Sequence, residues 1–267
     1  MYLMLGDEAD HEQNGRNKFF VYGGLFVNVA QVQALHAEVK AIRMDTGFQP
    51  TDPLKFSSKT CPKHITKEKH TEAKRRAITA AQKCGAKFSV QVTLHELARS
   101  TDHDDLVKWG ANTILGRFND FLENDANDFG LALLDRLPVK YPYRYLQEKF
   151  QTGLEFPWRD PVRLERILGL ASTCDGASHV ASVADIVLGA FRYCANEPER
   201  DKAGSAMFPS VARLMWHSRE GNRIKVRGRG LVLSPKTVRE PRLQNEYDDL
   251  IGRLSNYLQP KSDIAEA

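Results

Sequence analysis

The residues of this sequence most suited to chemistry are acidic side chains placed at the ends of apolar segments. Most of them end or follow a predicted strand, and one interrupts the apolar stripe of a predicted helix. They are Asp7, Glu8, Asp135 and Asp175, with Asp185 on the helix. Because ligands of open α/β sheets bind outside the carboxyl ends of the strands, we expect these carboxylates to converge on one edge of the sheet.

Such a cluster of carboxylates points to a metal site, because like charges repel unless a cation offsets them. Oxygen ligands suit Mg²⁺ or Mn²⁺, and two such ions about 4 Å apart stabilise the attacking and leaving oxygens of a phosphodiester displacement. Taken singly, each acid is better explained as a helix cap or as a member of a surface ion pair. Asp7, Asp135 and Asp185 together favour the metal site, because Asp185 has no obvious reason to interrupt an apolar stripe.

Strands and helices that would position these acids alternate along the chain. Hydrophobic patterns predict strands over residues 2–5, 17–27, 86–94, 129–134 and 164–171. Helices are predicted between Asn28 and Gly47 and over residues 67–83, 104–123, 143–150 and 180–194. The fold class is therefore α/β, with a largely parallel sheet covered on both faces. The first two strands, joined without a helix, are expected to form an antiparallel hairpin.

The character of the sequence changes near residue 200. We expect residues 1–200 to form the core and residues 201–267 to form a basic C-terminal extension packed on it. Within the extension, helices are predicted over residues 208–217 and 245–258, and the last residues are expected to be disordered.

Composition bounds the class of protein. The chain has 267 residues, 42% hydrophobic and 27% charged, which is typical of a globular protein with a core of its own. No apolar run approaches the roughly 18 residues of a membrane helix, so no membrane partner is expected. The first residues lack the basic segment of a signal peptide, and the cysteines are widely spaced. These features predict a cytoplasmic protein with reduced thiols.

Two stretches concentrate positive charge. Residues 59–76 carry a net charge of +5 and residues 213–242 a net charge of +7, which exceeds the +4 of the whole chain. Charge runs are often only solvated surface, but this segregation favours a polyanionic partner such as DNA or RNA, with the choice between them open. On a single strand, the alternating basic residues of the second stretch would line one face. The candidate nucleic-acid contacts are Lys67, Lys74, Arg223, Lys225, Arg227 and Arg229.

Four segments resemble the signature blocks of the uncharacterised family called domain of unknown function 3800. In order over residues 1–196 they are YLMLGDEAD, PLKFSS, LALLDR and SVADIVLGAFRY. The resemblance implies a ribonuclease-H-like fold and a metal-dependent nuclease. Asp7 and Glu8 match the opening acids of the family, and Lys55 matches its lysine. Asp135 matches its strand-end acid, Asp185 its helical acid, and Asp175 an aspartate that often precedes that helix.

The same resemblance implies roles for these residues. Asp7, Asp135 and Asp185 would hold one or two Mg²⁺ or Mn²⁺ ions, assisted by Glu8 or Asp175. Lys55 would neutralise charge on the transition state or bind the adjacent phosphate.

The sequence departs from the family where Ala9 and Asp10 replace Ser-Gly and where Ser182 replaces Gln. These departures leave open a catalytically inactive module that binds nucleic acid or protein on the same scaffold. A metal-dependent enzyme acting on a small phosphorylated substrate is a third possibility, which would not need a basic track.

Overall fold

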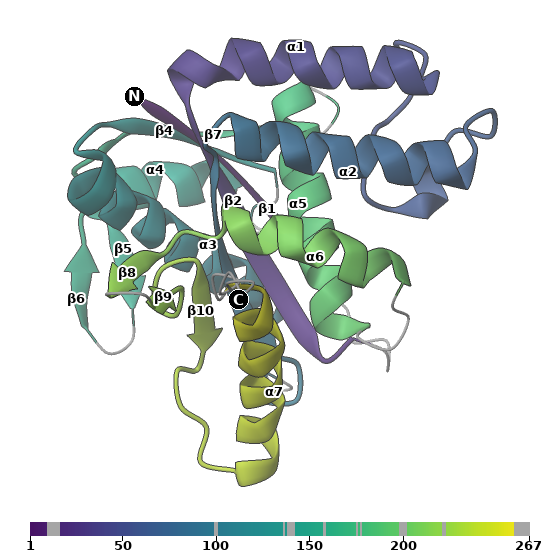
Figure 1. Cartoon of the computed structure of the whole chain (residues 1–267). Coiled ribbons are helices and arrows are strands. Elements are labelled where there is room, and N and C mark those ends of the chain that lie inside the picture. The colour runs from purple at the N-terminus through teal and green to yellow at the C-terminus, as the bar shows by residue number, and fades with distance from the viewer. Residues whose placement is uncertain are drawn as a thin grey trace, which may run out of the picture.

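A six-stranded mixed sheet forms the centre of the molecule (Figure 1), and its strand order is β10-β3-β2-β1-β4-β7. The computed structural model describes residues 1–9, 17–98, 101–135, 137, 142–156, 159–174, 176, 178–197, 202–220 and 223–258. The strands of the sheet are β1 (Tyr2–Ala9), β2 (Phe19–Asn28), β3 (Lys87–Leu94), β4 (Gly130–Leu134), β7 (Ile167–Ser172) and β10 (Leu231–Ser234). Two small antiparallel hairpins pair β5 (Leu154–Phe156) with β6 (Arg159–Val162) and β8 (Ser218–Glu220) with β9 (Arg223–Lys225).

Helices cover both faces of the sheet. They are α1 (Val29–Thr46), α2 (Lys67–Lys83), α3 (His103–Phe121), α4 (Pro142–Thr152), α5 (His179–Asn196), α6 (Lys202–Leu214) and α7 (Pro241–Leu258). A 3₁₀ turn, η1 (Ser58–Thr60), precedes α2, and a π-helical turn, η2 (Leu122–Ala126), continues α3. No helix within the described part of the chain is long and apolar enough to cross a bilayer.

Side-chain alternation along the strands separates two apolar cores. On β1, Leu5 faces the core that contains residues of α1, α2, α5, α6 and α7, and Met4 faces the core beneath α3 and α4. The predicted α/β fold class, with an antiparallel first hairpin and helices on both faces of the sheet, is confirmed.

The strand directions confirm one prediction and correct another. The first hairpin, β1–β2, is antiparallel, and β4 and β7 continue the sheet in parallel with β1. However, β3 runs antiparallel to β2, so the sheet is less parallel than predicted. The connection from β2 to β3 contains two helices, and together they bring the chain back to the end of the sheet at which β2 stops. Strand β3 therefore starts at that end and runs antiparallel to β2. A single helix would carry the chain to the opposite end and give a parallel strand.

Local signals set the helix boundaries where the sequence predicted them. The Asn28 side chain accepts a hydrogen bond from the backbone N–H of Ala30 at 2.9 Å and begins α1. Gly47, with φ of 90°, ends that helix in the left-handed conformation that glycine adopts without strain. Helix α6 begins earlier than predicted, at Lys202 rather than at residue 208.

Residues 202–258 contribute to the central sheet and to one of its cores. Strand β10, which the sequence analysis did not identify, pairs in parallel with β3. Helices α6 and α7 bury Phe208, Leu250 and other apolar side chains in the same core as α5. The tail predicted to be disordered, residues 260–267, lies outside the described residues.

Candidate active site

Two of the predicted acids follow the last paired residues of the neighbouring strands β1 and β4, although β1 is longer than predicted and continues along β2 to Ala9. Gly6 of β1 is level with Leu134 of β4, and the Asp135 backbone N–H donates to the Gly6 carbonyl at 2.8 Å. Asp7 follows Gly6 and Asp135 follows Leu134, so the two acids lie beside each other on strands that are about 4.8 Å apart. A Cβ on Gly6 would meet Leu134 at 2.8 Å on the α3 side of the sheet. By alternation, the half-buried side chains of Asp7 and Asp135 belong to the opposite face.

Helix α5 crosses that same face and brings the third acid toward it. Asp7 pairs with Gly23 of β2, and a Cβ on Gly23 would lie 2.8 Å from the Leu188 side chain of α5. Asp185 precedes Leu188 by one helical turn on α5, which contacts both β1 and β2. The structure therefore places all three acids on one face of the sheet.

Asp185 has a structural contact that the sequence did not reveal. Its Oδ2 accepts a hydrogen bond from the backbone N–H of Phe56 at 2.6 Å. The Lys74 ammonium donates to the Phe56 carbonyl at 3.2 Å and lies 4.6 Å from the centre of the Phe56 ring. The His70 imidazole contributes a further hydrogen bond, 3.0 Å from Nε2 to the Lys55 carbonyl. Side chains from α2 and α5 thus hold the Lys55–Phe56 segment from two sides.

The contacts that hold the Lys55–Phe56 segment bring titratable side chains together in a buried region. Burial lowers the pKa of the Lys74 ammonium, while the nearby Cys61 and Asp185 oppose that shift. Burial also lowers the pKa of His70, as does the positive charge of Lys74, and the bond to the Lys55 carbonyl opposes both effects. His70 therefore favours the neutral imidazole, with Nε2 as the donor.

Glu8 lies on the other face of the sheet from Asp7, so the two opening acids do not form a pair. Glu8 is level with Tyr22, whose side chain belongs to the core beneath α3. Burial raises the pKa of the Tyr22 phenol well above its usual value, and Tyr145, Glu8, Asp7 and Asp135 raise it further. Adjacent residues of a strand point to opposite faces, which separates Glu8 from the Asp7 side chain.

The predicted ligand set is only partly assembled. Asp175 lies outside the described residues. Among the residues that the structure describes, no three His, Cys, Asp or Glu side chains are grouped closely enough to hold a metal ion. Mg²⁺ is usually bound by one or two carboxylates together with waters and substrate phosphates. The adjacent carboxylates of Asp7 and Asp135 fit that smaller donor set.

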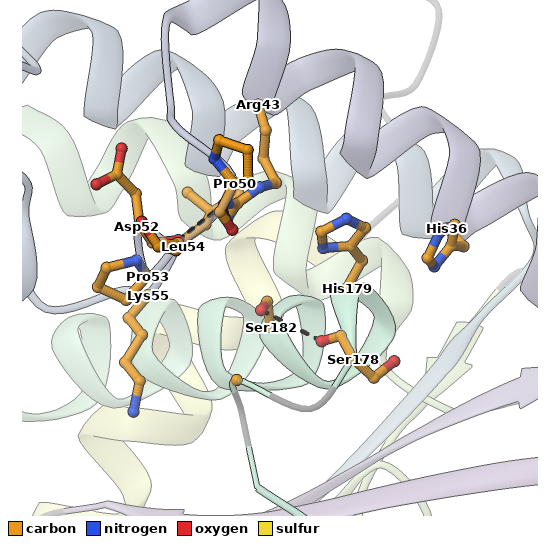
Figure 2. Close-up of a pocket in the computed structure, with 12 residues that line it drawn as sticks. His36, Arg43, Pro50, Asp52, Pro53, Leu54, Lys55, Ser178, His179 and Ser182 are labelled. Atoms are coloured by element: carbon orange, nitrogen blue, oxygen red, sulfur yellow. Dashed lines mark hydrogen bonds between the residues drawn. The ribbon is translucent and has the colours of Figure 1, made fainter.

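Lys55 lies beside a pocket of about 330 Å³ between α1, the loop before η1 and the start of α5 (Figure 2). Its lining residues include His36, Arg43, Asp52, Lys55, Ser178, His179 and Ser182. Sequence reasoning did not find this pocket, because no spacing along the chain connects α1 with α5.

One predicted nucleic-acid contact on α2 is not accessible. Lys67 is exposed at the start of the helix, but Lys74 is only 7% exposed and is engaged by the Phe56 carbonyl. The prediction for Lys74 was wrong because Lys74 lies on the face of α2 that packs against the core.

The second basic stretch does not form one continuous strand. Strand β9 ends at Lys225, so Arg227 and Arg229 do not share a strand face with it. Arg227 donates to the Lys236 carbonyl at 3.0 Å. Arg229 pairs with Asp125 at 2.8 Å and lies 5.1 Å from the centre of the Trp216 ring. Strand β9 also contains Arg223, and the β8–β9 hairpin lies well apart from α2 in Figure 1. The β8–β9 hairpin and α2 therefore present separate basic surfaces.

Comparisons with known proteins give only distant similarities. No family model and no curated protein matches the chain. A chain of the PCNA:RNase HII complex from Archaeoglobus fulgidus is 14% identical, with a TM-score of 0.44, covering 100% of this chain and 98% of that one. Bst-RNase HIII in complex with Mn²⁺ is 13% identical, with a TM-score of 0.43, covering 80% of this chain and 62% of that one. A mutant form of Bst-RNase HIII is 15% identical, with a TM-score of 0.41, covering 96% of this chain and 64% of that one.

Proposed function

We propose that this protein is a divalent-metal-dependent nuclease that hydrolyses phosphodiester bonds of DNA or RNA, related to the family called domain of unknown function 3800. The observation that carries the proposal is the pair of carboxylates, Asp7 and Asp135, at adjacent strand ends on the face that α5 and Asp185 cross. Two neighbouring carboxylates on a half-buried surface repel each other, and a cation relieves that repulsion.

Asp7 and Asp135 would hold Mg²⁺ or Mn²⁺, with the rest of the coordination shell left to waters and a substrate phosphate. When bound, the metal polarises the phosphate and lowers the pKa of an attacking water. Asp185 adds negative charge on the same face and also fixes the Lys55–Phe56 segment through the Phe56 N–H. Lys55, carried on that segment, would bind a phosphate oxygen and neutralise the charge that develops on it.

The exposed basic residues support a nucleic-acid substrate. Lys67, Lys225 and Arg227 are exposed, and each would contact phosphates of the backbone without reading its sequence. Because backbone contacts release counterions, binding should weaken steeply as the salt concentration rises. A small phosphorylated substrate would show no such dependence.

The proposal is tested with Asp7→Asn and Asp135→Asn, each assayed for Mn²⁺-dependent cleavage of labelled single-stranded and double-stranded DNA, single-stranded RNA and an RNA/DNA hybrid. Each variant should lose at least about a hundredfold in rate, comparable to removing one preorganised charge-stabilising group. Asp105→Asn is the matched control, because Asp105 is an exposed aspartate on α3, on the other side of the sheet. Full activity in both strand-end variants would remove the metal-site proposal.

Calorimetric titration with Mn²⁺ separates the nuclease from an inactive binding module. Asp7→Asn should abolish binding that the unaltered protein shows, with the fold unchanged by circular dichroism. If the unaltered protein binds no Mn²⁺ either alone or with an oligonucleotide, yet binds the oligonucleotide, the inactive module is the better description. The second condition matters because a substrate phosphate can complete the coordination shell.

A further inference from the structure

The pocket beside Lys55 is lined by imidazoles and cationic side chains from three parts of the chain. His36 and Arg43 come from α1, Lys55 from the loop before η1, and His179 from α5. The His36 and His179 rings lie 4.7 Å apart between their centres, and Figure 2 shows His179 between Arg43 and His36. Two imidazoles this close can share one bound anion, because each ring donates through one nitrogen.

The positive charge of Arg43 has a fixed position beside the pocket. The Arg43 guanidinium donates to the carbonyls of Gln49 and Asp52, each at 2.8 Å, and these bonds hold its charge beside the pocket. Burial lowers the pKa of His179, and Arg43, His36 and Lys40 lower it further. These three neighbours show that the surroundings of His179 are electropositive, which favours a bound anion.

Asp52 is the acidic residue among the described residues that line the pocket, and its carboxylate lies away from the two imidazoles. Asp52 Oδ2 accepts a hydrogen bond from the Gln49 backbone N–H at 2.6 Å and lies 3.1 Å from the His64 imidazole. Figure 2 shows this carboxylate on the far side of Arg43 from both His179 and His36. Asp52 therefore partly offsets the charge of Arg43, on the side of that residue away from the two imidazoles.

We propose that this pocket binds a phosphate group of a nucleic-acid strand, held by His36, His179 and the Ser178 hydroxyl. Ser178 Oγ accepts a hydrogen bond from the Val180 N–H at 3.1 Å, and a hydroxyl that accepts one bond keeps its proton to donate. The volume of about 330 Å³ lies within the range of small-ligand sites and accommodates a phosphate with part of its nucleotide.

The pocket lies close to Asp185, which is on the same face of the sheet as the other two acids. Ser182 lines the pocket and precedes Asp185 by three residues on α5, a rise of about 4.5 Å. Lys55 also lines the pocket, and the next residue, Phe56, is bonded to Asp185. A strand with one phosphate at the carboxylates would present a neighbouring phosphate here, and in this respect the inference rests on the proposed nuclease function.

The test begins with calorimetric titration of inorganic phosphate into the full chain and into the double variant His36→Ala/His179→Ala. The affinity of the double variant should fall about tenfold or more, the loss expected for one charge-assisted hydrogen bond. His36 is exposed and His179 is not in the core, so both substitutions leave the buried side chains in place. His217→Ala is the control, since His217 precedes β8 and does not line the pocket. Equal affinity in the double variant, or no saturable binding to the full chain, overturns the site.

A second titration identifies the source of the phosphate. Fluorescence anisotropy with a labelled single-stranded oligonucleotide, without metal, should also show about tenfold weaker binding to the double variant. Loss of inorganic phosphate binding with unchanged oligonucleotide binding would overturn the strand assignment and leave a site for a free phosphate compound. Neither titration depends on cleavage, so failure of the nuclease proposal would appear only in the Mn²⁺ assays.

Discussion

The hydrogen bond from Phe56 to Asp185 permits a quantitative prediction about how the loop before η1 is held on α5. In Asp185→Ala, the partly buried Phe56 N–H loses its acceptor, which costs about 1–3 kcal/mol. The buried Lys74 ammonium also loses a neighbouring negative charge, which adds to the cost. In Asp185→Asn, an oxygen acceptor remains but without charge, and a neutral bond is about half as strong. We therefore expect destabilisation of about 1 kcal/mol for Asn and about 2–3 kcal/mol for Ala.

Urea and thermal unfolding measure these differences. In a chain of this size, each kcal/mol of destabilisation lowers the melting temperature by about 2–4 °C. Hydrogen exchange at the Phe56 amide reports the same bond locally and should accelerate most in the Ala variant. Asp45→Ala is the matched control, because Asp45 joins α1 to α2 through Arg76 in an exposed ion pair. Such a pair contributes at most about 1 kcal/mol.

Equal stability of Asp185→Ala and Asp45→Ala, with unchanged exchange at the Phe56 amide, would refute this account of the loop. Because Asp185→Asn keeps the acceptor, it also separates the two roles of the acid. A large loss of Mn²⁺-dependent activity with only a small loss of stability would assign Asp185 a direct part in the chemistry. If activity and stability fall in proportion, Asp185 acts as a positioning residue.

Two further predictions concern stability. The depressed pKa of His70 means that the unfolded chain binds more protons once the pH falls below about 6.5, so stability should decrease there by at most about 1.4 kcal/mol per pH unit. His70→Gln should flatten that part of the stability–pH curve, and an unaltered slope would contradict the assignment. Gly110→Ala should destabilise the fold by about 1–3 kcal/mol, because its Cβ would meet Tyr22 at 2.6 Å. Gly252→Ala, which meets nothing within 4 Å on α7, should instead stabilise it by up to about 1 kcal/mol. Matching signs for the two glycines in thermal unfolding would argue against the packing explanation.

The sequence alone determined the elements that carry the acids and the edge of the sheet at which those acids lie. The cap at Asn28, the stop at Gly47 and the apolar run of residues 129–134 act over a few residues, so local chain preferences specify them. The positions of Asp7 and Asp135 beside each other follow from two such strands being parallel neighbours. Placing both acids at strand ends predicted only that they share one edge of the sheet, whereas their adjacency depends on β1 and β4 being neighbouring strands.

Only the tertiary structure decided which side chains meet across elements. The antiparallel direction of β3, the addition of β10 and the burial of Lys74 depend on how distant segments share one sheet and one core. The bond from Phe56 to Asp185 and the contact between His36 and His179 join helices and loops far apart in the chain. Such contacts are set by the packing of whole elements, because hydrophobic periodicity specifies the buried face of a helix but not the partner against which that face is buried.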